Sequence, residues 1–309
     1  QKHLKVFDME NQTRHFLNIN ELQLEDLKNI IKKSHLLKKD SSKGRLREKK
    51  ILAMIFEKPS TRTRVSFEVG MKQLDGDVVI LDYADSQLGR GESLLDTIKV
   101  LNRYVDLIMY RGSDEKKLYE ISEHSKVPII NGLTDESHPC QILADIMTLE
   151  EQFNQISDLN ICWVGDGNNV CNSWIHACHH FNFNFHISCP KNHFPSNDLI
   201  DSVKPSKITL FDDPKKAVFN ADVLITDTWI SMGMKDKENR LRKFTNFQVN
   251  SELISHSKKN TFFLHCLPAH RGVEVTDEVI DSKNSLVWDE AENRLYVHQA
   301  ILLWCLGNI

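Results

Sequence analysis

Short runs of apolar residues alternate along the chain with longer segments whose apolar positions recur every three or four residues. The short runs are typical of buried strands, and the longer segments are typical of amphipathic helices. A chain that repeats strand and helix in this order predicts parallel sheets with helices on both faces. The expected strands are 51–56, 78–81, 105–110, 127–130, 160–164, 185–188, 208–211, 221–226, 261–265 and 286–288.

The same pattern divides the chain into two halves. It turns polar around residues 153–159, between a predicted helix and the strand at 160–164. Strand and helix alternate on both sides of this segment, so we expect an α/β protein with two doubly wound parallel-sheet domains joined by helices. The expected domains are 1–150 and 151–309, with a C-terminal helix at about 291–309 that packs back toward the first domain.

Composition fits a globular protein of this size. The chain has 309 residues, of which 40% are hydrophobic and 27% charged, enough for two domains with buried cores. The formal net charge is −4, so any affinity for phosphate must be local. No apolar run is long enough to span a bilayer, which predicts that the protein has no membrane partner.

The cysteines indicate a reducing compartment. There are seven, an odd number, and none forms a C-x-x-C pair. Several lie in apolar runs, which is typical of buried thiols rather than of a disulfide framework. We therefore expect a cytoplasmic protein. The chain begins at Gln1 rather than methionine, so a removed leader stays open.

A basic segment follows the first predicted helix. Residues 18–39 have helical spacing, and residues 32–50 contain nine basic and two acidic residues. Such a segment is typical either of a nucleic-acid patch or of a solvated helix face. No aromatic side chains are interleaved with the lysines, so we expect no nucleic-acid partner.

The strongest chemical signal is the segment Ser60–Arg64, with the sequence Ser-Thr-Arg-Thr-Arg, directly after the strand at 51–56 and Pro59. Ser60 stands where a helix N-cap is expected, and the following residues fill the first helical turn with hydroxyl and guanidinium donors. A helix N-terminus already presents unpaired N–H groups and partial positive charge. The alternative is a capped, solvated helix start, but five consecutive donors favour a phosphate site.

Other polar residues follow predicted strands in the same way. Ligands of open α/β sheets bind at the carboxyl ends of the strands. Arg111 lies at one such end, and Asp227 at another, where a carboxylate suits a cationic amine. His138 and Gln141 are three residues apart at a helix start marked by Pro139, so they lie on one side and suit a carbonyl oxygen and an NH2 group. Solvated or capping side chains are the alternative.

Several further segments are ambiguous. The loop at 86–93 has two glycines and the charged segment at 235–243 resembles a lid; both are also typical of plain surface. The segment Gly165–Val170 imitates a dinucleotide fingerprint, but valine stands at the third glycine position. Histidines and cysteines between 171 and 180 match no common zinc spacing, so we expect no metal site.

Four motifs in this order resemble the aspartate/ornithine carbamoyltransferase superfamily over essentially the whole chain. Residues 60–64 and 138–141 resemble patterns that the superfamily shares. Residues 227–233 (Asp-Thr-Trp-Ile-Ser-Met-Gly) and 265–268 (His-Cys-Leu-Pro) resemble the signatures of its ornithine-specific members. The resemblance implies transfer of the carbamoyl group of carbamoyl phosphate to the δ-amine of L-ornithine, giving L-citrulline and phosphate, a step of the arginine-biosynthesis or urea-cycle type.

The resemblance also implies roles for the matching residues. Domain 1–150 would bind carbamoyl phosphate and domain 151–309 ornithine, with no cofactor and no metal. The catalytic residues would be Arg111, His138, Asp227 and Cys266. Ornithine would contact Asn169, Asp227, Ser231 and Met232. Carbamoyl phosphate would contact Ser60, Thr61, Arg62, Thr63, Gln87, Arg111, His138, Gln141, Cys266, Leu267 and Arg294.

Three finer expectations come from the resemblance as well. Gln87 would reach the site of a neighbouring subunit, which implies a homotrimer with sites near subunit interfaces. The loop that carries it differs among relatives. The Leu267–Pro268 peptide bond would be cis.

Three other functions remain open from the residues. The nearest is a carbamoyltransferase that acts on aspartate, putrescine or an acylated ornithine. The others are a nicotinamide-dependent oxidoreductase built on Gly165–Val170 and a non-catalytic phosphate or nucleic-acid binding protein. The sequence leaves open whether the reaction serves biosynthesis or arginine breakdown in the cell.

Overall fold

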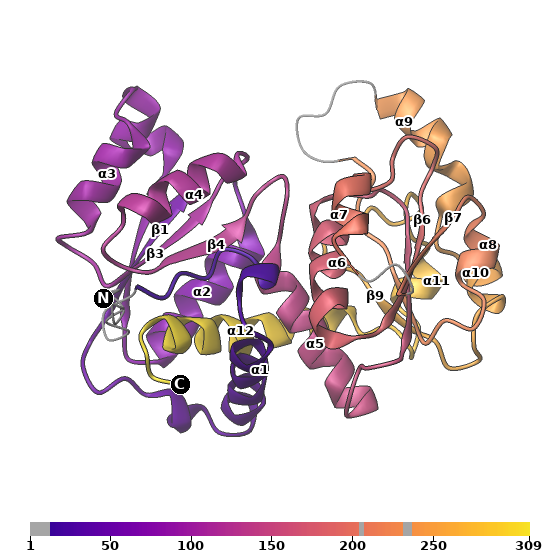
Figure 1. Cartoon of the computed structure of the whole chain (residues 1–309), viewed down its shortest axis with the longest axis horizontal. Helices are drawn as coiled ribbons and strands as arrows, with labels where there is room; N and C mark the ends of the chain where they lie inside the picture. Colours follow the sequence, from indigo (N-terminus) through magenta and orange to yellow (C-terminus); the bar gives the residue numbers. More distant parts are fainter. Residues whose placement is uncertain (1–12, 204–206, 231–236) are drawn as a thin grey trace, which may run out of the picture.

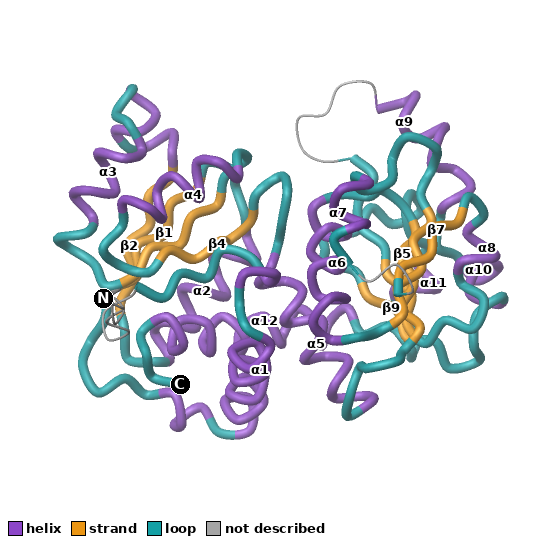
Figure 2. Tube along the Cα trace, in the orientation of Figure 1, coloured by secondary structure: helices purple, strands orange, loops and turns teal. Residues whose placement is uncertain are grey.

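The computed structural model describes residues 13–203, 207–230 and 237–309. They form two lobes, each built around a parallel sheet (Figure 1). Figure 2 shows the strands inside each lobe and helices outside them. Among the described helices, none combines the length and the apolar character that crossing a membrane requires.

The first lobe contains a four-stranded sheet in the order β2-β1-β3-β4, with every neighbouring pair parallel. β1 and β3 lie in the centre and are almost entirely apolar and buried, as expected for strands covered on both faces. The elements are β1 (Ile51–Phe56), α2 (Thr61–Gln73), β2 (Asp77–Asp82), α3 (Leu94–Leu101), β3 (Leu107–Arg111), α4 (Glu115–His124) and β4 (Ile129–Leu133).

The second lobe contains a five-stranded parallel sheet in the order β7-β6-β5-β8-β9. Strand order reverses direction next to β5, which is the position where open α/β sheets form ligand crevices. The elements are β5 (Asn160–Val164), α6 (Asn169–Phe181), β6 (Asn184–Ser188), α7 (Asn197–Asp201), β7 (Ile208–Phe211), α8 (Pro214–Ala217), β8 (Val223–Ile225), α9 (Lys237–Phe244), α10 (Ser251–Ser255), β9 (Phe262–Leu264) and α11 (Asp277–Ile280).

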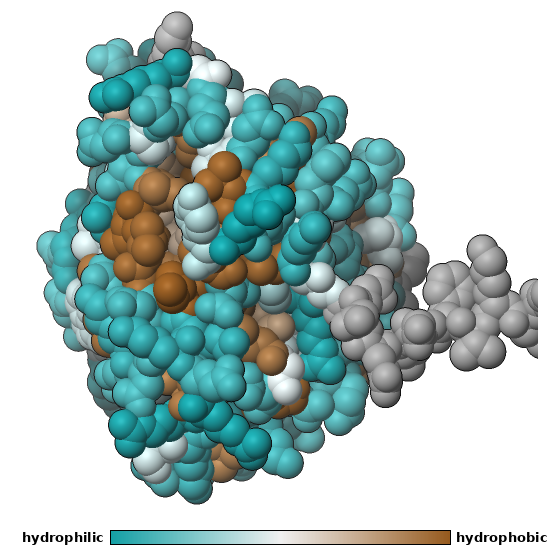
Figure 3. All heavy atoms as spheres, turned by 90° about the vertical axis from the view of Figure 1, so that its left-hand side faces the viewer, coloured by the Kyte–Doolittle hydropathy of each residue, from teal (hydrophilic) through white to brown (hydrophobic). Residues whose placement is uncertain are grey.

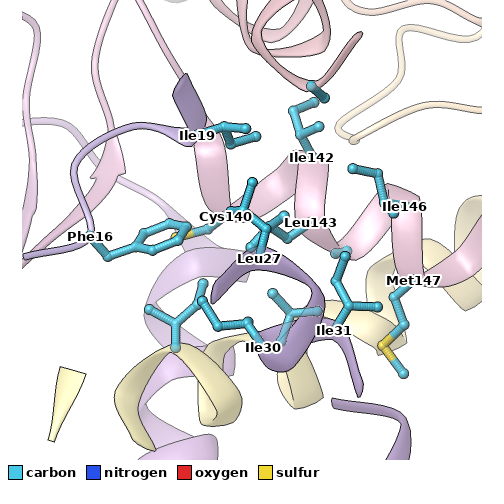
Figure 4. Close-up of a cluster of buried hydrophobic side chains, with 14 of the residues drawn as sticks. Phe16, Ile19, Leu27, Ile30, Ile31, Cys140, Ile142, Leu143, Ile146 and Met147 are labelled. Carbon is cyan, nitrogen blue, oxygen red and sulfur yellow. The ribbon is translucent and has the colours of Figure 1, made fainter. Parts of the chain in front are cut away.

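α1 (Leu24–Lys39) packs against the helices that connect the lobes, α5 (Pro139–Phe153) and α12 (Val287–Cys305). The last of them leaves the second sheet and packs against α1, α2 and α5, so the C-terminal helix returns to the first lobe as expected. Figure 4 shows apolar side chains of α1 and α5 facing one another in the buried core. The joint between the lobes is therefore a packed apolar core rather than a bare linker.

The two-sheet α/β architecture agrees with the sequence prediction, and nine of the ten expected strands are present within a few residues of their predicted bounds. The strand predicted at 286–288 is wrong. Ser285 forms a single bridge to Phe263 of β9, and Val287 then begins α12. The acidic residues Asp289 and Glu290 occupy the first turn of that helix, where they favour helix over strand.

Other predicted bounds shift as well. The C-terminal helix spans Val287–Cys305 instead of about 291–309. The helix predicted at 18–39 is a 3-10 turn, η1 (Ile19–Glu21), followed by α1. The loop at 86–93 contains the 3-10 helix η4 (Gln87–Arg90), which ends at Gly91 with a φ of 100°. Residues 237–243 of the predicted lid belong to α9, and residues 235 and 236 lie outside the described ranges.

Two compositional predictions can be compared with the structure. All seven cysteines lie within the described ranges and are free thiols, and six of them are buried. In the basic segment at 32–50, several side chains form ion pairs with acidic neighbours; Lys38 pairs with Glu151 at 2.9 Å and Lys50 with Asp106 at 3.2 Å. The segment therefore behaves as a solvated, paired surface.

Candidate active site

The segment from β1 to α2 has the predicted helix start. β1 ends at Phe56, and Ser60 caps α2, with its side chain accepting a hydrogen bond from the backbone N–H of Thr63 at 3.3 Å. The extended backbone of Ser60 after Pro59 turns the chain into the helix. The first turn of α2 therefore lies at the carboxyl end of β1, where a ligand of this sheet is expected.

Thr63 joins three elements of the first lobe. Its buried hydroxyl oxygen accepts hydrogen bonds from Arg111 at the end of β3, at 3.2 Å, and from Arg294 of α12, at 2.7 Å. Both lone pairs of the hydroxyl are therefore used, and its hydrogen remains to be donated. Because Arg294 comes from the C-terminal helix, the return of α12 to the first lobe completes this group.

The two guanidinium groups have no anionic partner among the described side chains. Both Nε atoms are buried and unpaired. Burial, and next the charges of Arg294 and Arg62, lower the pKa of Arg111 to about 10, and burial also lowers the pKa of Arg294. Both remain charged at pH 7, so the site holds positive charge that an anion would neutralise. Arg64 differs, because it pairs with Asp82 at 3.0 Å.

His138 lies beside these arginines at the N-cap of α5. Its backbone N–H donates to the hydroxyl of Ser173 at 2.8 Å, and its ring is buried with Nδ1 unpaired among the described residues. Burial, followed by the charges of Arg294 and Arg111, lowers the pKa of His138 well below its usual value. The ring is therefore neutral at pH 7 and can donate one hydrogen bond without adding charge.

Gln141 lies one turn further along α5, held by two acidic side chains. Its Nε2 donates to Asp145 at 2.8 Å and to Glu290 of α12 at 2.9 Å. Pro139 occupies the first turn of α5, as predicted, and sets His138 and Gln141 at the same end of the helix. Cys140, between them, is buried and donates to the carbonyl of Asn131.

The second lobe supplies a different group, centred on Asp227 after β8. This buried carboxylate accepts hydrogen bonds from Asn168 Nδ2 at 2.7 Å, from the thiol of Cys266 at 3.1 Å and from the N–H of Thr228 at 2.7 Å. Burial, and next the charge of Asp227, raise the pKa of the Cys266 thiol well above its usual value. Cys266 is therefore a neutral hydrogen-bond donor at pH 7 rather than a thiolate.

The loop after β9 is fixed by His265. Its Nδ1 accepts the N–H of Leu267 at 2.9 Å, so Nε2 carries the proton and donates to buried Glu274 at 3.1 Å. Leu267 has a φ of 57°, and the Leu267–Pro268 peptide bond is cis, as the resemblance implied. The loop thus holds Cys266 against Asp227.

Among the described residues, one cluster of side chains has the geometry to bind a metal ion. Asp227, His265 and Cys266 offer ligand atoms within 4.8 Å of one another. Both ring nitrogens of His265 already take part in hydrogen bonds, to Leu267 and Glu274. Metal binding there would have to break a buried hydrogen bond, so the arrangement fits a hydrogen-bonded support better than a metal centre.

The two groups meet where the start of α6 lies against the segment before α5. Asn169 Nδ2 donates to the carbonyl of Thr134 at 2.8 Å, and Asn172 Nδ2 to that of Glu136 at 3.0 Å. One N–H of Asn169 is therefore engaged with the first lobe, and among the described residues its second N–H and its Oδ1 are left for a ligand.

Asn168, in contrast, caps α6. Its Oδ1 accepts from the N–H groups of Val170 and Cys171 at 3.0 and 3.2 Å. This cap occupies the helix N-terminus that a dinucleotide pyrophosphate would need, which argues against the dinucleotide interpretation of Gly165–Val170.

Some predicted residues stand apart from this arrangement. Gln87 is exposed in η4 and, among the described residues, hydrogen-bonds none of the other predicted site residues. Ser231 and Met232 lie outside the described residues. The sequence indicated that Asn168, like Asn169, recognises a small ligand, whereas the structure shows it capping α6 and bonded to Asp227. The sequence indicated no role for Asp145 or Glu290, because neither acid lies in a recognisable local pattern.

Comparison with known proteins decides the family. The model described as the carbamoyl-P binding domain of aspartate/ornithine carbamoyltransferase matches residues 14–151. The model described as the Asp/Orn binding domain matches residues 157–305. The chain belongs to the aspartate/ornithine carbamoyltransferase family. The carbamoyltransferase fold thus spans both lobes, with one family domain in each.

Similar carbamoyltransferases cover nearly the whole chain. The ornithine carbamoyltransferase of Nitrobacter winogradskyi is 49% identical over 305 residues, which cover 97% of this chain and 99% of the relative. The structure of ornithine carbamoyltransferase from Pyrococcus furiosus is 45% identical with a TM-score of 0.91, covering 96% of this chain and 98% of that one. The anabolic ornithine carbamoyltransferase from Campylobacter jejuni is 36% identical with a TM-score of 0.89, covering 96% and 100%.

Proposed function

We propose that this carbamoyltransferase transfers the carbamoyl group of carbamoyl phosphate to the δ-amine of L-ornithine, giving L-citrulline and phosphate. One observation carries the proposal. Arg111 and Arg294 converge on Thr63 without an anionic partner among the described side chains, while a buried carboxylate, Asp227, stands across the junction of the lobes. The cationic site suits the phosphate group of an acyl phosphate, and the carboxylate of Asp227 suits the ammonium group of an amine substrate.

The first domain, residues 1–150, would hold carbamoyl phosphate together with Arg294. The phosphate would lie at the start of α2, on Ser60, Thr61, Arg62 and Thr63. Arg111 would bridge phosphate and carbonyl oxygen, neutral His138 would donate to that oxygen, and Gln141 would bind the carbamoyl NH2 group. Cys266 and Leu267 would lie between the two substrates.

The reaction would begin with attack by the neutral δ-amine on the carbamoyl carbon. An alkyl ammonium has a pKa of about 10.4, so on the order of one molecule in a thousand has the free lone pair at neutral pH. Asp227, in the second domain at 151–309, would orient ornithine together with Asn169, Ser231 and Met232, while the neighbouring positive charge favours loss of the δ proton.

Negative charge then develops on the carbonyl oxygen. Thr63, Arg111 and His138 would stabilise it as preorganised donors, each worth roughly 3–4 kcal/mol in the transition state. The C–O bond to phosphate would break as the C–N bond becomes established, and the nitrogen that attacked would pass its extra proton to the departing phosphate oxygen. Arg62 and Arg294 would stabilise the hydrogen phosphate that leaves. Phosphate is an adequate leaving group, so the proposed chemistry uses no cofactor.

The acceptor amine is the part of the proposal that needs a direct test. The purified enzyme should be assayed with carbamoyl phosphate and, in parallel, ornithine, aspartate, putrescine and an acylated ornithine. We expect no product from aspartate, because a buried carboxylate suits a cationic amine and repels an acid. We expect the highest kcat/KM with ornithine, because putrescine and the acylated ornithine lack the free α-amino group that Asp227 would bind. Higher kcat/KM with any other acceptor would replace ornithine in the proposal.

We further propose a homotrimer in which Gln87 reaches the site of a neighbouring subunit. Large apolar side chains are exposed on α2, on the sheet-edge strand β2 and in the turn after it, namely Val65, Val69, Val79 and Tyr83. Figure 3 shows apolar side chains gathered on the first-lobe face, at the left of Figure 1. An apolar face beside an edge strand is typical of a subunit interface, and Gln87 follows β2 directly.

The cellular setting is also a proposal. Free, mostly buried cysteines suit a reducing compartment, which supports a cytoplasmic location. The anabolic role that the Campylobacter relative carries in its name supports a place in arginine biosynthesis. Loss of the gene in its host should then produce arginine dependence that citrulline relieves.

A further inference from the structure

The Gln141 amide has a fixed orientation. Its Nε2 donates to Asp145 Oδ1 at 2.8 Å and to Glu290 Oε1 at 2.9 Å. A side-chain amide carries two N–H hydrogens, so both are used. Its Oε1 is buried and has no partner among the described residues. The atom that Gln141 has left for a ligand is therefore an acceptor.

The two carboxyl groups that hold this amide are themselves buried. Asp145 and Glu290 are each 1% exposed, and they hydrogen-bond each other. Burial raises the pKa of Asp145 to about 7 and, together with the neighbouring Asp145, raises the pKa of Glu290 well above its usual value. Two adjacent buried carboxyl groups do not both ionise, so the pair holds a shared proton at neutral pH.

Glu290 also reaches the second lobe. Its Oε2 accepts the backbone N–H of His265 at 3.0 Å, and His265 precedes Cys266 in the chain. The pair therefore connects α5, α12 and the end of β9. A buried acidic pair costs desolvation energy, which hydrogen bonds from the Gln141 amide and from the backbone N–H of His265 help to offset.

We propose that Asp145 and Glu290 are positioning residues that hold Gln141 with its acceptor oxygen facing the substrate, so that the site selects acyl phosphates carrying an N–H donor. A carbamoyl group offers such a donor in its NH2. An acetyl group, equal in shape, offers a methyl and leaves the Gln141 oxygen unpaired. This inference rests on the proposed function. The acidic pair would allow the site to discriminate carbamoyl phosphate from acetyl phosphate.

Asp145→Leu tests the inference. The change removes one of the two acceptors that fix the Gln141 amide, so the amide can turn about its remaining bond to Glu290 and point an N–H at the carbamoyl NH2, which it repels. We expect the KM for carbamoyl phosphate to rise about tenfold, the value of one hydrogen bond, while the inhibition constant of acetyl phosphate changes less than about twofold. Equal weakening of both ligands, as a merely structural role predicts, would overturn the inference.

Two further variants separate this effect from general damage. Asp145→Asn keeps an acceptor for Gln141 and replaces the shared proton by an amide N–H toward Glu290, so it should retain discrimination within about twofold. Thr148→Val removes a buried hydrogen bond between α5 and Asn293 without touching Gln141, so both ligand constants should stay unchanged. Lost discrimination in either variant would contradict the inference.

A fourth measurement covers the case in which Asp145→Leu does not fold. Glu290→Gln keeps the shape, but its NH2 group must face either the Gln141 NH2 or the N–H of His265. The ratio of acetyl phosphate to carbamoyl phosphate constants should fall at least about threefold, and an unchanged ratio would overturn the inference. If the unaltered enzyme carbamoylates no amine, the proposed function fails instead, so the two failures are distinguishable.

Discussion

At the scale of single residues, Thr63 joins the two guanidinium groups of the proposed phosphate site. Its hydroxyl accepts from Arg111 and Arg294, which fixes the two guanidinium groups and leaves its own hydrogen for a substrate oxygen. Arg111 and Arg294 carry the same charge and repel each other. The Thr63 hydroxyl is the acceptor that holds the two guanidinium groups close together. Deleting that hydroxyl should therefore affect both binding and catalysis.

We expect Thr63→Val to lower kcat/KM about a hundredfold. The change removes one oxyanion donor and leaves two buried cations without their shared acceptor. Steady-state kinetics with carbamoyl phosphate as the varied substrate would measure it. Thr261→Val, which removes a buried hydroxyl bonded to the backbone carbonyl of Ala221 in the second lobe, is the matched control and should leave kcat/KM unchanged. Similar losses in both variants would contradict the assignment.

At the scale of elements, the position of α12 decides whether the site is complete. This helix carries Arg294 and Glu290, and it is anchored to α2 by His298, whose ring stacks on Phe67 at 3.8 Å between centroids and contacts Ser66 Oγ at 2.9 Å. Burial, and next the charge of Arg294, lower the pKa of His298 well below its usual value. The packing of two helices thus depends on a neutral histidine.

This arrangement predicts a pH effect on stability. The unfolded histidine binds a proton below about pH 6.5 while the folded one does not, so the unfolded state is favoured as the pH falls. His298 should therefore contribute a loss of up to about 1.4 kcal/mol of unfolding free energy per pH unit below about pH 6.5, and none above it.

Urea unfolding of the unaltered protein and of His298→Asn at pH 7.5, 6.5 and 5.5 would measure this contribution. The variant is less stable at pH 7.5, and the difference between the two proteins should shrink as the pH falls. Other titrating groups are common to both proteins and cancel in the difference. A constant difference across this range would refute the role of His298.

At the scale of the whole molecule, the two lobes divide the work. The cationic group belongs to the first lobe and α12, whereas Asp227, Asn168 and Cys266 belong to the second. The lobes meet through the contact of Asn169 with Thr134 and through the packing of α5 on α6 and of α12 on β9. A substrate bound to one lobe should consequently depend little on side chains of the other.

Arg62→Ala should abolish measurable binding of carbamoyl phosphate in titration calorimetry, because it removes a cation from the start of α2. Asp227→Ala should bind carbamoyl phosphate within about threefold of the unaltered protein and lose carbamoyl transfer. An equal loss of carbamoyl phosphate binding in the two variants would end the proposed division of labour.

The proposed trimer leads to a separate prediction. Val79→Glu introduces a charge on the exposed apolar side of β2, so it should shift the molar mass in light scattering from three chains toward one and lower activity at least about tenfold. Phe219→Glu changes an equally apolar, exposed residue on the second lobe and should leave the mass unchanged. A single-chain mass for the unaltered protein would refute the trimer.

Much of this protein was predictable from the sequence, because the informative patterns are local. Apolar runs located the strands β1, β5 and β7 to the residue, and the helix start at Ser60 followed from cap and donor chemistry within five positions. The strand predicted at 286–288 is wrong because the chain forms only a single bridge to β9, at Ser285, before α12 begins at Val287. A run of three apolar residues is too short to distinguish a strand from the start of a buried helix.

The sequence by itself determined the two α/β halves, the capped helix start at Ser60 and the order of the four motifs. Only the tertiary structure decided which distant side chains meet: Arg294 on Thr63, 231 positions apart, and Glu290 on Gln141, 149 apart. The physical reason is that hydrogen bonds and charge act over a few ångströms in space, whereas periodicity and capping are set by neighbours along the chain. The sequence predicted that the C-terminal helix returns to the first lobe, and the structure decides which of its side chains reach Thr63 and Gln141.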